Sequence, residues 1–146
     1  MLKEEIDDGW PLVLQREQKV LQVSRQISTR CRAVLRIDRA ALVRMYDPSR
    51  DFNDLARHFG VSAGSINNAL SRLVRIAREL ERGETLGQAS RGKRYVVIVP
   101  VDHEAEGQYV LDVLSSHEFT GVVEELDRAE DWRLDASEMK EHDGEF

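Results

Sequence analysis

Residues 54 to 73 read DLARHFGVSAGSINNALSRL, and this stretch carries the strongest structural signal in the chain. Gly60 stands where a three-residue turn between two helices needs a left-handed backbone, which costs glycine little. Ala56 stands where the helices would come closest, and Ser62 can accept hydrogen bonds from free N–H groups at the start of the second helix. The apolar residues suited to the wedge between two steeply crossing helices are Leu55, Phe59, Val61, Ile66, Leu70 and Leu73. The pattern predicts a helix-turn-helix with helices near 52–59 and 63–80, although a plain αα-hairpin used only for packing has similar features.

The polar side of the second predicted helix, residues 63–80, suits contact with DNA. In this motif, side chains near the start of the second helix reach base edges in the major groove. An Asn amide pairs there with adenine, while arginines contact guanine or, more often, phosphates. We expect Asn67 and Asn68 to contact bases and Gly64 to let the helix start approach a phosphate. Double-stranded DNA is therefore the expected partner, and the candidate contact residues are Arg57, Ser62, Gly64, Ser65, Asn67, Asn68, Ser71, Arg72 and Arg75.

The charge of the chain is segregated along the sequence. The 146 residues have a formal net charge of -6, which taken whole argues against a nucleic-acid partner. Residues 28–94 nevertheless hold 14 Lys and Arg against 7 Asp and Glu, whereas residues 124–146 hold 3 against 10. This distribution suits a DNA-binding module whose other parts are kept away from the polyanion, or else arginines that merely solvate helices. A further hypothesis is that the acidic tail docks on the basic face and tunes DNA affinity.

Several classes of protein are excluded by composition. The one cysteine, Cys31, rules out an intramolecular disulfide framework and is expected to be a buried, inert thiol. No apolar run approaches the ~18 residues of a membrane span. The N-terminus lacks the apolar stretch of a signal peptide. We therefore expect a cytoplasmic protein.

The sequence divides into four expected parts within a mainly α fold that has a small β element. In residues 1–37, apolar positions at three-, four- and seven-residue steps predict a helix over about 13–35, for packing or dimerisation. Residues 38–83 form the helix-turn-helix domain, with Asp38 as a helix N-cap. Residues 84–123 hold a wing or turn, a β-branched strand at 95–101 and a helix near 104–116, and residues 124–146 form the acidic tail. The apolar residues of the N-terminal stripe are Val13, Val20, Val23, Ile27, Cys31 and Val34.

The predicted strand at 95–101 needs a partner, because a single strand leaves backbone groups unpaired. Residues 85–90 could supply one as a winged hairpin, or a second copy of the chain could pair the same segment across a dimer. We favour these two arrangements over a buried core strand. The expected dimer contacts are Tyr95, Val97, Val99, Tyr109 and Val113.

The stretch VSAGSINNALSRL at residues 61–73, followed after a gap by the strand and an amphipathic helix, resembles the KorA/TrfB-type plasmid repressors. Residues 41–75 are also similar to the PapB-type fimbrial regulators and, more distantly, to region 4 of sigma factors. The resemblance implies a DNA-binding homodimer that regulates transcription, in which the strand and helix after the helix-turn-helix form the dimer. The chain departs from the family by its longer spacer at 81–94, its extra N-terminal segment and its acidic tail.

No group of residues predicts catalysis. Asp102, His103 and Glu104 follow the predicted strand and, with His117 and Glu118, could hold a metal or transfer protons, but a polar turn with Asp102 as helix N-cap is favoured. No glycine-rich phosphate loop follows a strand, so no enzyme activity, cofactor, metal or small-molecule ligand is expected. The predicted function is a homodimeric repressor that inserts residues 63–80 into the major groove of an inverted repeat. The alternatives are a phage or plasmid DNA-transaction protein (small terminase-like or replication initiation) and a sigma-like or anti-repressor module that binds protein.

Overall fold

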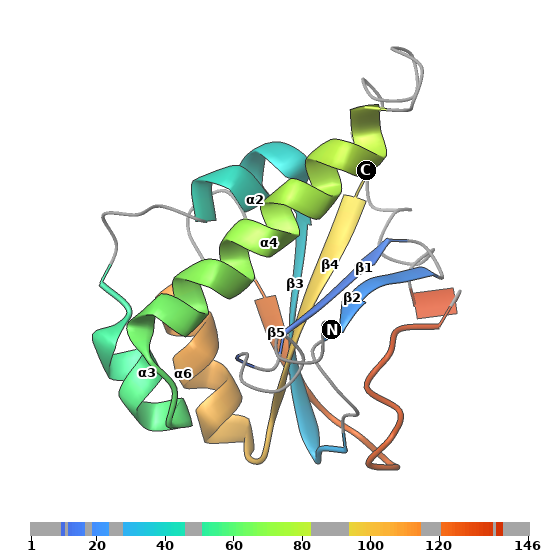
Figure 1. Ribbon diagram of the computed structural model, residues 1–146. Coiled ribbons are helices and arrows are strands. Elements are labelled where there is room, and N and C mark those ends of the chain that lie inside the picture. The colour runs from blue at the N-terminus through green and yellow to red at the C-terminus, as the bar shows by residue number, and fades with distance from the viewer. Residues whose placement is uncertain are drawn as a thin grey trace, which may run out of the picture.

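In the computed structural model, helices lie against one face of an antiparallel sheet. The structure describes Trp10 and residues 12–16, 19–23, 28–45, 51–82, 94–114, 121–135 and 137–138. The strands are β1 (Val13–Arg16), β2 (Lys19–Val23), β3 (Cys31–Asp38), β4 (Arg94–Val101) and β5 (Gly121–Glu125), in the order β2-β1-β4-β3-β5. The helices are α2 (Arg39–Met45), α3 (Asn53–Phe59), α4 (Ala63–Arg82) and α6 (Glu104–Leu114). Figure 1 shows these helices gathered on one side of the sheet, with α4 running along the layer.

The N-terminal part of the chain forms strands, so the predictions of a helix over 13–35 and of a mainly α fold are wrong. Residues 13–16, 19–23 and 31–38 each join the sheet by antiparallel pairing. In β3, alternate side chains such as Leu35 and Val34 enter different apolar clusters, one on each face of the sheet. A strand covered on both faces is apolar at nearly every position. Such a run also contains apolar residues three and four positions apart, which is the spacing that predicts a helix.

The strand β4 lies at the centre of the sheet, which corrects the expectation of a wing or a dimer strand. It pairs with β1 on one side and with β3 on the other. Tyr95, Val97 and Val99 are fully buried in the core beneath the helices, and Tyr109 and Val113 of α6 pack partly against the same core. These expected dimer contacts therefore serve the interior of one chain. The alternative wing at 85–90 lies outside the described residues.

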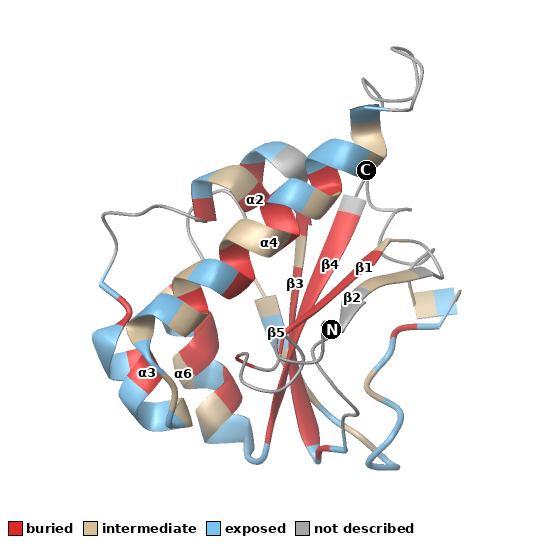
Figure 2. Ribbon diagram, viewed as in Figure 1, coloured by how far each residue is buried: buried red, intermediate tan, exposed pale blue. Residues whose placement is uncertain are grey.

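The core on the helix side depends on one stripe of α4. Its residues Ile66, Leu70, Leu73 and Ala77 are at most 1% exposed. Their three- and four-residue spacing places them on one face of the helix, toward the sheet. Figure 2 shows this buried stripe together with the buried lengths of β3 and β4. None of the described helices is both long and apolar enough to cross a membrane.

A C-terminal strap, defined as the described residues between 126 and 138, covers part of the opposite face of the sheet. Figure 1 shows it, in orange and red, on the side of the strands away from the helices. Leu134 is the buried anchor of the strap. Its apolar neighbours in this second cluster are Val13, Val34, Val96 and Ile98, with Val20 and Trp132 partly buried beside them. The described part of the acidic tail thus lies away from α4. Residues 139–146, which also belong to the docking hypothesis, lie outside the described residues.

Candidate nucleic-acid interface

A short turn at Gly60 joins α3 to α4. Gly60 has φ 70° and ψ 30°, the left-handed conformation that the sequence predicts at this position. Its N–H donates to the carbonyl of Arg57 at 3.3 Å, and the N–H of Val61 donates to the carbonyl of Ala56 at 3.0 Å. These bonds satisfy carbonyls at the end of α3. Both helices occur where the sequence predicts them, but they belong to a helix layer on a sheet and not to a mainly α core.

The start of α4 is capped by Ser62. The N–H of Ser65 donates to the Ser62 hydroxyl at 3.0 Å, and the two hydroxyl oxygens lie 3.1 Å apart. This capping satisfies one of the N–H groups that a helix start leaves without a partner. Ser62 and Gly64 are exposed, whereas Ser65 is half-buried. The predicted cap is confirmed, and it occupies the Ser62 hydroxyl in a local bond.

The two predicted base-reading amides differ in their surroundings. Asn68 is exposed on the outer side of α4. Asn67 is half-buried, and its Oδ1 atom is buried with no hydrogen-bond partner in the described part of the chain. A bidentate pair with adenine needs both the oxygen and the nitrogen of the amide. The Asn68 amide is therefore open to a partner, whereas the Asn67 oxygen is not.

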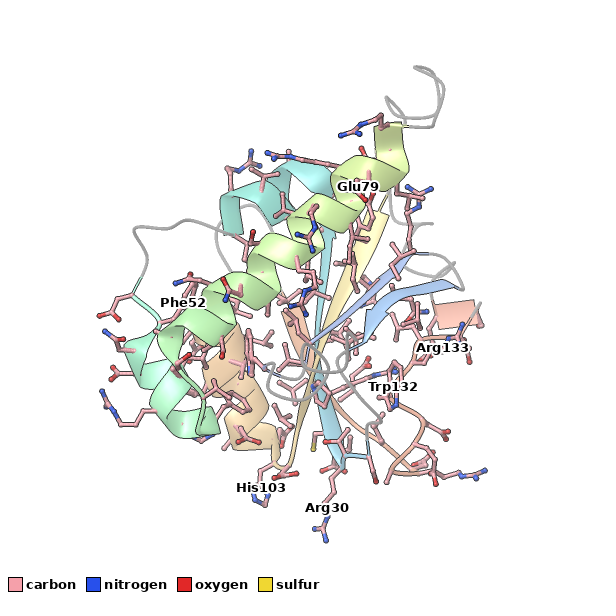
Figure 3. All side chains as sticks on the ribbon, viewed as in Figure 1. Arg30, Phe52, Glu79, His103, Trp132 and Arg133 are labelled. Carbon is pink, nitrogen blue, oxygen red and sulfur yellow. The ribbon has the colours of Figure 1, made fainter. Side chains whose placement is uncertain are left out.

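A row of arginines continues along the outer side of α4. Arg75, Arg78 and Arg82 are exposed, and Arg72 is half-buried. At a rise of 1.5 Å per residue, the distance from Arg72 to Arg82 is about 15 Å along the helix. Figure 3 shows side chains that end in nitrogen along α4, and it labels Glu79 on the same helix. We call Gly64, Asn68, Arg72, Arg75, Arg78 and Arg82 the α4 ridge. Exposed Glu79 lies among them and carries the opposite charge.

Arg82 was missing from the contact residues expected from the sequence, whereas Arg78 is a candidate phosphate contact on the sequence as well. Arg82 follows from the same periodicity, because α4 extends to Arg82 and the stripe opposite its apolar face continues to that end. Exposed Arg44 on α2 adds a further positive charge on a helix that packs against α4. Ser71 is half-buried at the margin of the ridge. The basic surface is thus longer than the start of the helix alone.

Two residues of α3 are engaged within the chain. Arg57 is exposed but forms an ion pair with Asp54, with 3.0 Å between Nη1 and Oδ1. His58 lies with Nε2 2.6 Å from Glu106 Oε2 and contacts the Tyr109 ring edge-on, at 5.4 Å between centroids. The two contacts of His58 fasten α3 to α6. Arg57 is accordingly a weaker candidate for a phosphate contact than the arginines of the α4 ridge.

The opposite face of the molecule is acidic. β5 and the strap border an open groove of about 730 Å³. Its carboxylate side chains are those of Glu125, Asp127, Glu130, Asp131, Asp135 and Glu138, and its basic side chains are those of Arg32 and Arg133. A polyanion is repelled by such a surface, so the charge segregation along the sequence becomes a difference between two faces of the fold.

The residues considered for catalysis do not form a site in the described structure. Asp102, His103 and Glu104 are exposed where β4 turns into α6, and Figure 3 shows His103 pointing away from the molecule. The N–H of Asp102 donates to Glu106 Oε1 at 2.7 Å, which makes this segment a hydrogen-bonded turn. Within the described ranges, no group of three His, Cys, Asp or Glu side chains is placed to hold a metal ion. His117 and Glu118 lie outside them.

The thiol of Cys31 is buried in the core. Burial raises its pKa, and the negative charge of Glu125 adds to this effect. A thiol is a weak nucleophile until it loses its proton, so these surroundings are those of an inert core residue.

No protein-family model, curated protein or solved structure matches the chain.

Proposed function

We propose that the chain binds double-stranded DNA through the α4 ridge and acts in the cytoplasm as a homodimeric repressor that occupies a promoter. One observation carries the proposal: the outward side of α4, the second of two helices joined by a three-residue turn, bears an exposed amide and a row of arginines. A helix that merely covers a sheet needs polar residues outside, but alternating charges would serve that role equally well. On the exposed side of α4, Glu79 is the one carboxylate, against the three exposed arginines Arg75, Arg78 and Arg82, so positive charge predominates.

Each part of the α4 ridge has a separate role in this proposal. Asn68 lies near the start of the helix, from which side chains reach base edges. Gly64 leaves the capped helix start open to a phosphate. Arg72, Arg75, Arg78 and Arg82 lie farther along, where the helix crosses the DNA backbone. These arginines supply affinity that depends on salt, and Asn68 supplies sequence preference.

The test begins with selection of bound sequences from a random duplex pool, using the full chain. Arg75→Gln should weaken binding to all sequences and lower the slope of log K against log salt by about 0.9, the value for one lost phosphate contact. Arg128→Gln is the matched control, because Arg128 is exposed on the strap and the change in charge is identical. Asn68→Ala should reduce discrimination at one base pair by about 1–3 kcal/mol and leave the salt slope unchanged.

Two outcomes would contradict the proposal. If Arg75→Gln and Arg128→Gln alter the salt slope equally, the α4 ridge is not the binding surface. If the chain has no affinity for duplex DNA even at low salt but is retained by an acidic protein, the ridge serves a protein partner.

A further inference from the structure

Within the described part of the chain, no strand pairs with the outer edge of β5. β5 pairs with β3 on one side, and β3 also pairs with β4, so β5 is terminal in the sheet. Val122 on this strand is 46% exposed and is the exposed large hydrophobic residue of the described structure. Such an edge offers backbone N–H and C=O groups to another strand.

Val122 ends an apolar row that crosses the sheet on the strap face. The pairing places Val13 beside Ile98, Ile98 beside Val34, and Val34 beside Val122. The first three are at most 1% exposed, so burial stops abruptly at Val122. A further strand alongside β5 would continue this row and remove Val122 from water, which is favourable in proportion to the area covered.

The other edge of the sheet carries the devices that proteins use to prevent edge pairing. The pairing of β1 with β2 shifts register between Leu14 and Gln15, and β2 begins with Lys19. Val20 and Leu21 are half-buried against the two apolar clusters. Bulges and lysines discourage the addition of a strand. β5, which reads GVVEE, has no proline and no shift in register with β3, and its two charged residues, Glu124 and Glu125, lie at one end of the strand, after Val122.

β5 is also firmly positioned by its neighbours. A Cβ atom at Gly121 would lie 2.8 Å from the carbonyl oxygen of Val34, and one at Gly107 of α6 would lie 2.8 Å from Val123 Cγ1. Such distances leave no room for a side chain, so backbone and side chains are in tight contact on the helix side. On the strap face, Arg32 Nε lies 2.7 Å from Glu124 Oε1. A strand that is already fixed loses little conformational freedom when a partner is added.

We propose that a second copy of the chain pairs its own β5 antiparallel along this edge, about a two-fold axis near Val122. The two Val122 side chains then lie side by side and complete the apolar row. The Glu124–Glu125 pairs of the two copies lie apart, whereas parallel pairing in register would place like charges together. One strand serves both partners, as an isologous two-fold interface requires.

This pairing determines the relative orientation of the helix layers in the two copies. Side chains of paired strands continue on the same faces of a sheet, so the two-fold axis is perpendicular to the joined sheet. The ten strands have the order β2-β1-β4-β3-β5-β5-β3-β4-β1-β2, and both helix layers lie on one side. The two α4 ridges consequently face the same side of the dimer, the side that would meet DNA. This last step rests on the proposed function, whereas the dimer itself does not.

The test measures the mass of the full chain in solution by sedimentation equilibrium without DNA. The wild type should have twice the 16.7 kDa of one chain. Val122→Arg should weaken dimerisation by about 30-fold or more, because it puts a charge at the centre of the interface. Ala105→Arg, at an exposed position of α6, is the control and should remain a dimer.

A second variant tests the same dimer by forming a cross-link instead of by weakening the interface. Val122→Cys should form a disulfide-linked dimer under mild oxidation, because cross-strand Cα distances of about 4.5–5.5 Å fall within the range for disulfides. Val20→Cys on β2 should not, and the native Cys31 is buried. Cross-linking of Val20→Cys in place of Val122→Cys, or a monomeric wild type, would overturn the proposal. If a monomeric wild type still binds specific DNA, the dimer fails, and with it the homodimeric part of the proposed function, while DNA binding through the α4 ridge stands.

Discussion

The two faces of the sheet are covered in different ways. The helix face is sealed by apolar side chains, among them Leu70 and Leu73 of α4. The strap face has a smaller apolar cluster, and the strap is held to it through polar groups of Gln15 and Arg32. Apolar burial is non-directional and scales with area, whereas hydrogen bonds fix one geometry. The strap therefore has a defined position despite its small contact area.

Gln15 and Arg32 hold successive parts of the strap. Gln15 Nε2 donates to the Leu134 carbonyl at 2.7 Å, and the Leu134 N–H donates to Gln15 Oε1 at 3.2 Å. Arg32 Nη1 donates to the Trp132 carbonyl at 2.9 Å, and Nη2 donates to Glu138 Oε2 at 2.8 Å. Each bond replaces one to water, so its net contribution to stability is small. The strap should be easier to detach than any helix.

The largest expected effect comes from shortening a buried side chain on the helix face. Leu70 is fully buried in the core between α4 and the sheet. Leu70→Ala removes apolar contacts and leaves a cavity, which should lower the free energy of unfolding by about 3 kcal/mol. Denaturant unfolding monitored by circular dichroism measures this loss.

The control for Leu70→Ala is Asn68→Ala on the exposed side of the same helix, which should change stability by at most about 0.5 kcal/mol. Equal losses for the two variants would show that α4 is not packed on the sheet through the stripe that contains Leu70.

A smaller effect is expected on the strap face. The Arg32 side chain is 5% exposed, but Glu124 and Glu138 are 36% and 37% exposed and can return to water. Arg32→Ala should therefore cost about 2 kcal/mol, less than loss of one partner in a fully buried pair. Arg32→Met, which keeps the packing of the long side chain, should cost less.

Limited proteolysis separates local from global loosening in these variants. Arg32→Ala should accelerate cleavage within residues 126–135 more than its loss of global stability explains, because the strap opens alone. Leu70→Ala should accelerate cleavage only in proportion to global unfolding. Uniform cleavage throughout Arg32→Ala would mean that the two faces unfold as one unit.

The sequence predicted local features better than the layers that contain them. The turn at Gly60, the inward stripe of α4 and the strand at 95–101 each depend on a few neighbouring residues, and all three are present. The sheet is different, because β1, β3 and β4 are far apart in the chain and meet only in the fold. Arg32 adds to the difficulty, since a charged residue in an apolar run resembles the exposed side of a helix although here it is buried.

The candidate site shows the same division. Periodicity correctly placed Asn68 and Arg75 on the outer side of α4. It could not separate Asn68 from Asn67, because burial of the Asn67 oxygen depends on side-chain packing and not on spacing. Local sequence patterns also could not predict that the helices cover one face of the sheet and the acidic strap covers part of the other.

The smallest effect concerns a polar contact on the helix face. Tyr95 is fully buried, and its hydroxyl donates to Glu81 at the end of α4. Burial and the nearby Glu81 raise the pKa of Tyr95 above its ordinary value near 10, against the opposing effect of Arg16. Above pH 10 the unfolded chain loses this proton while the native chain keeps it, so the stability due to the raised pKa is complete below pH 10 and declines as the pH rises.

Tyr95→Phe should remove this decline. The difference in unfolding free energy between wild type and variant should shrink by up to about 1.4 kcal/mol for each pH unit above 10, as measured by denaturant unfolding from pH 8 to 11. The comparison cancels other groups that titrate in this range. Parallel profiles for the two proteins would mean that Tyr95 has the same pKa in the native and the unfolded chain. The contact between α4 and β4 would then contribute nothing to the pH dependence of stability.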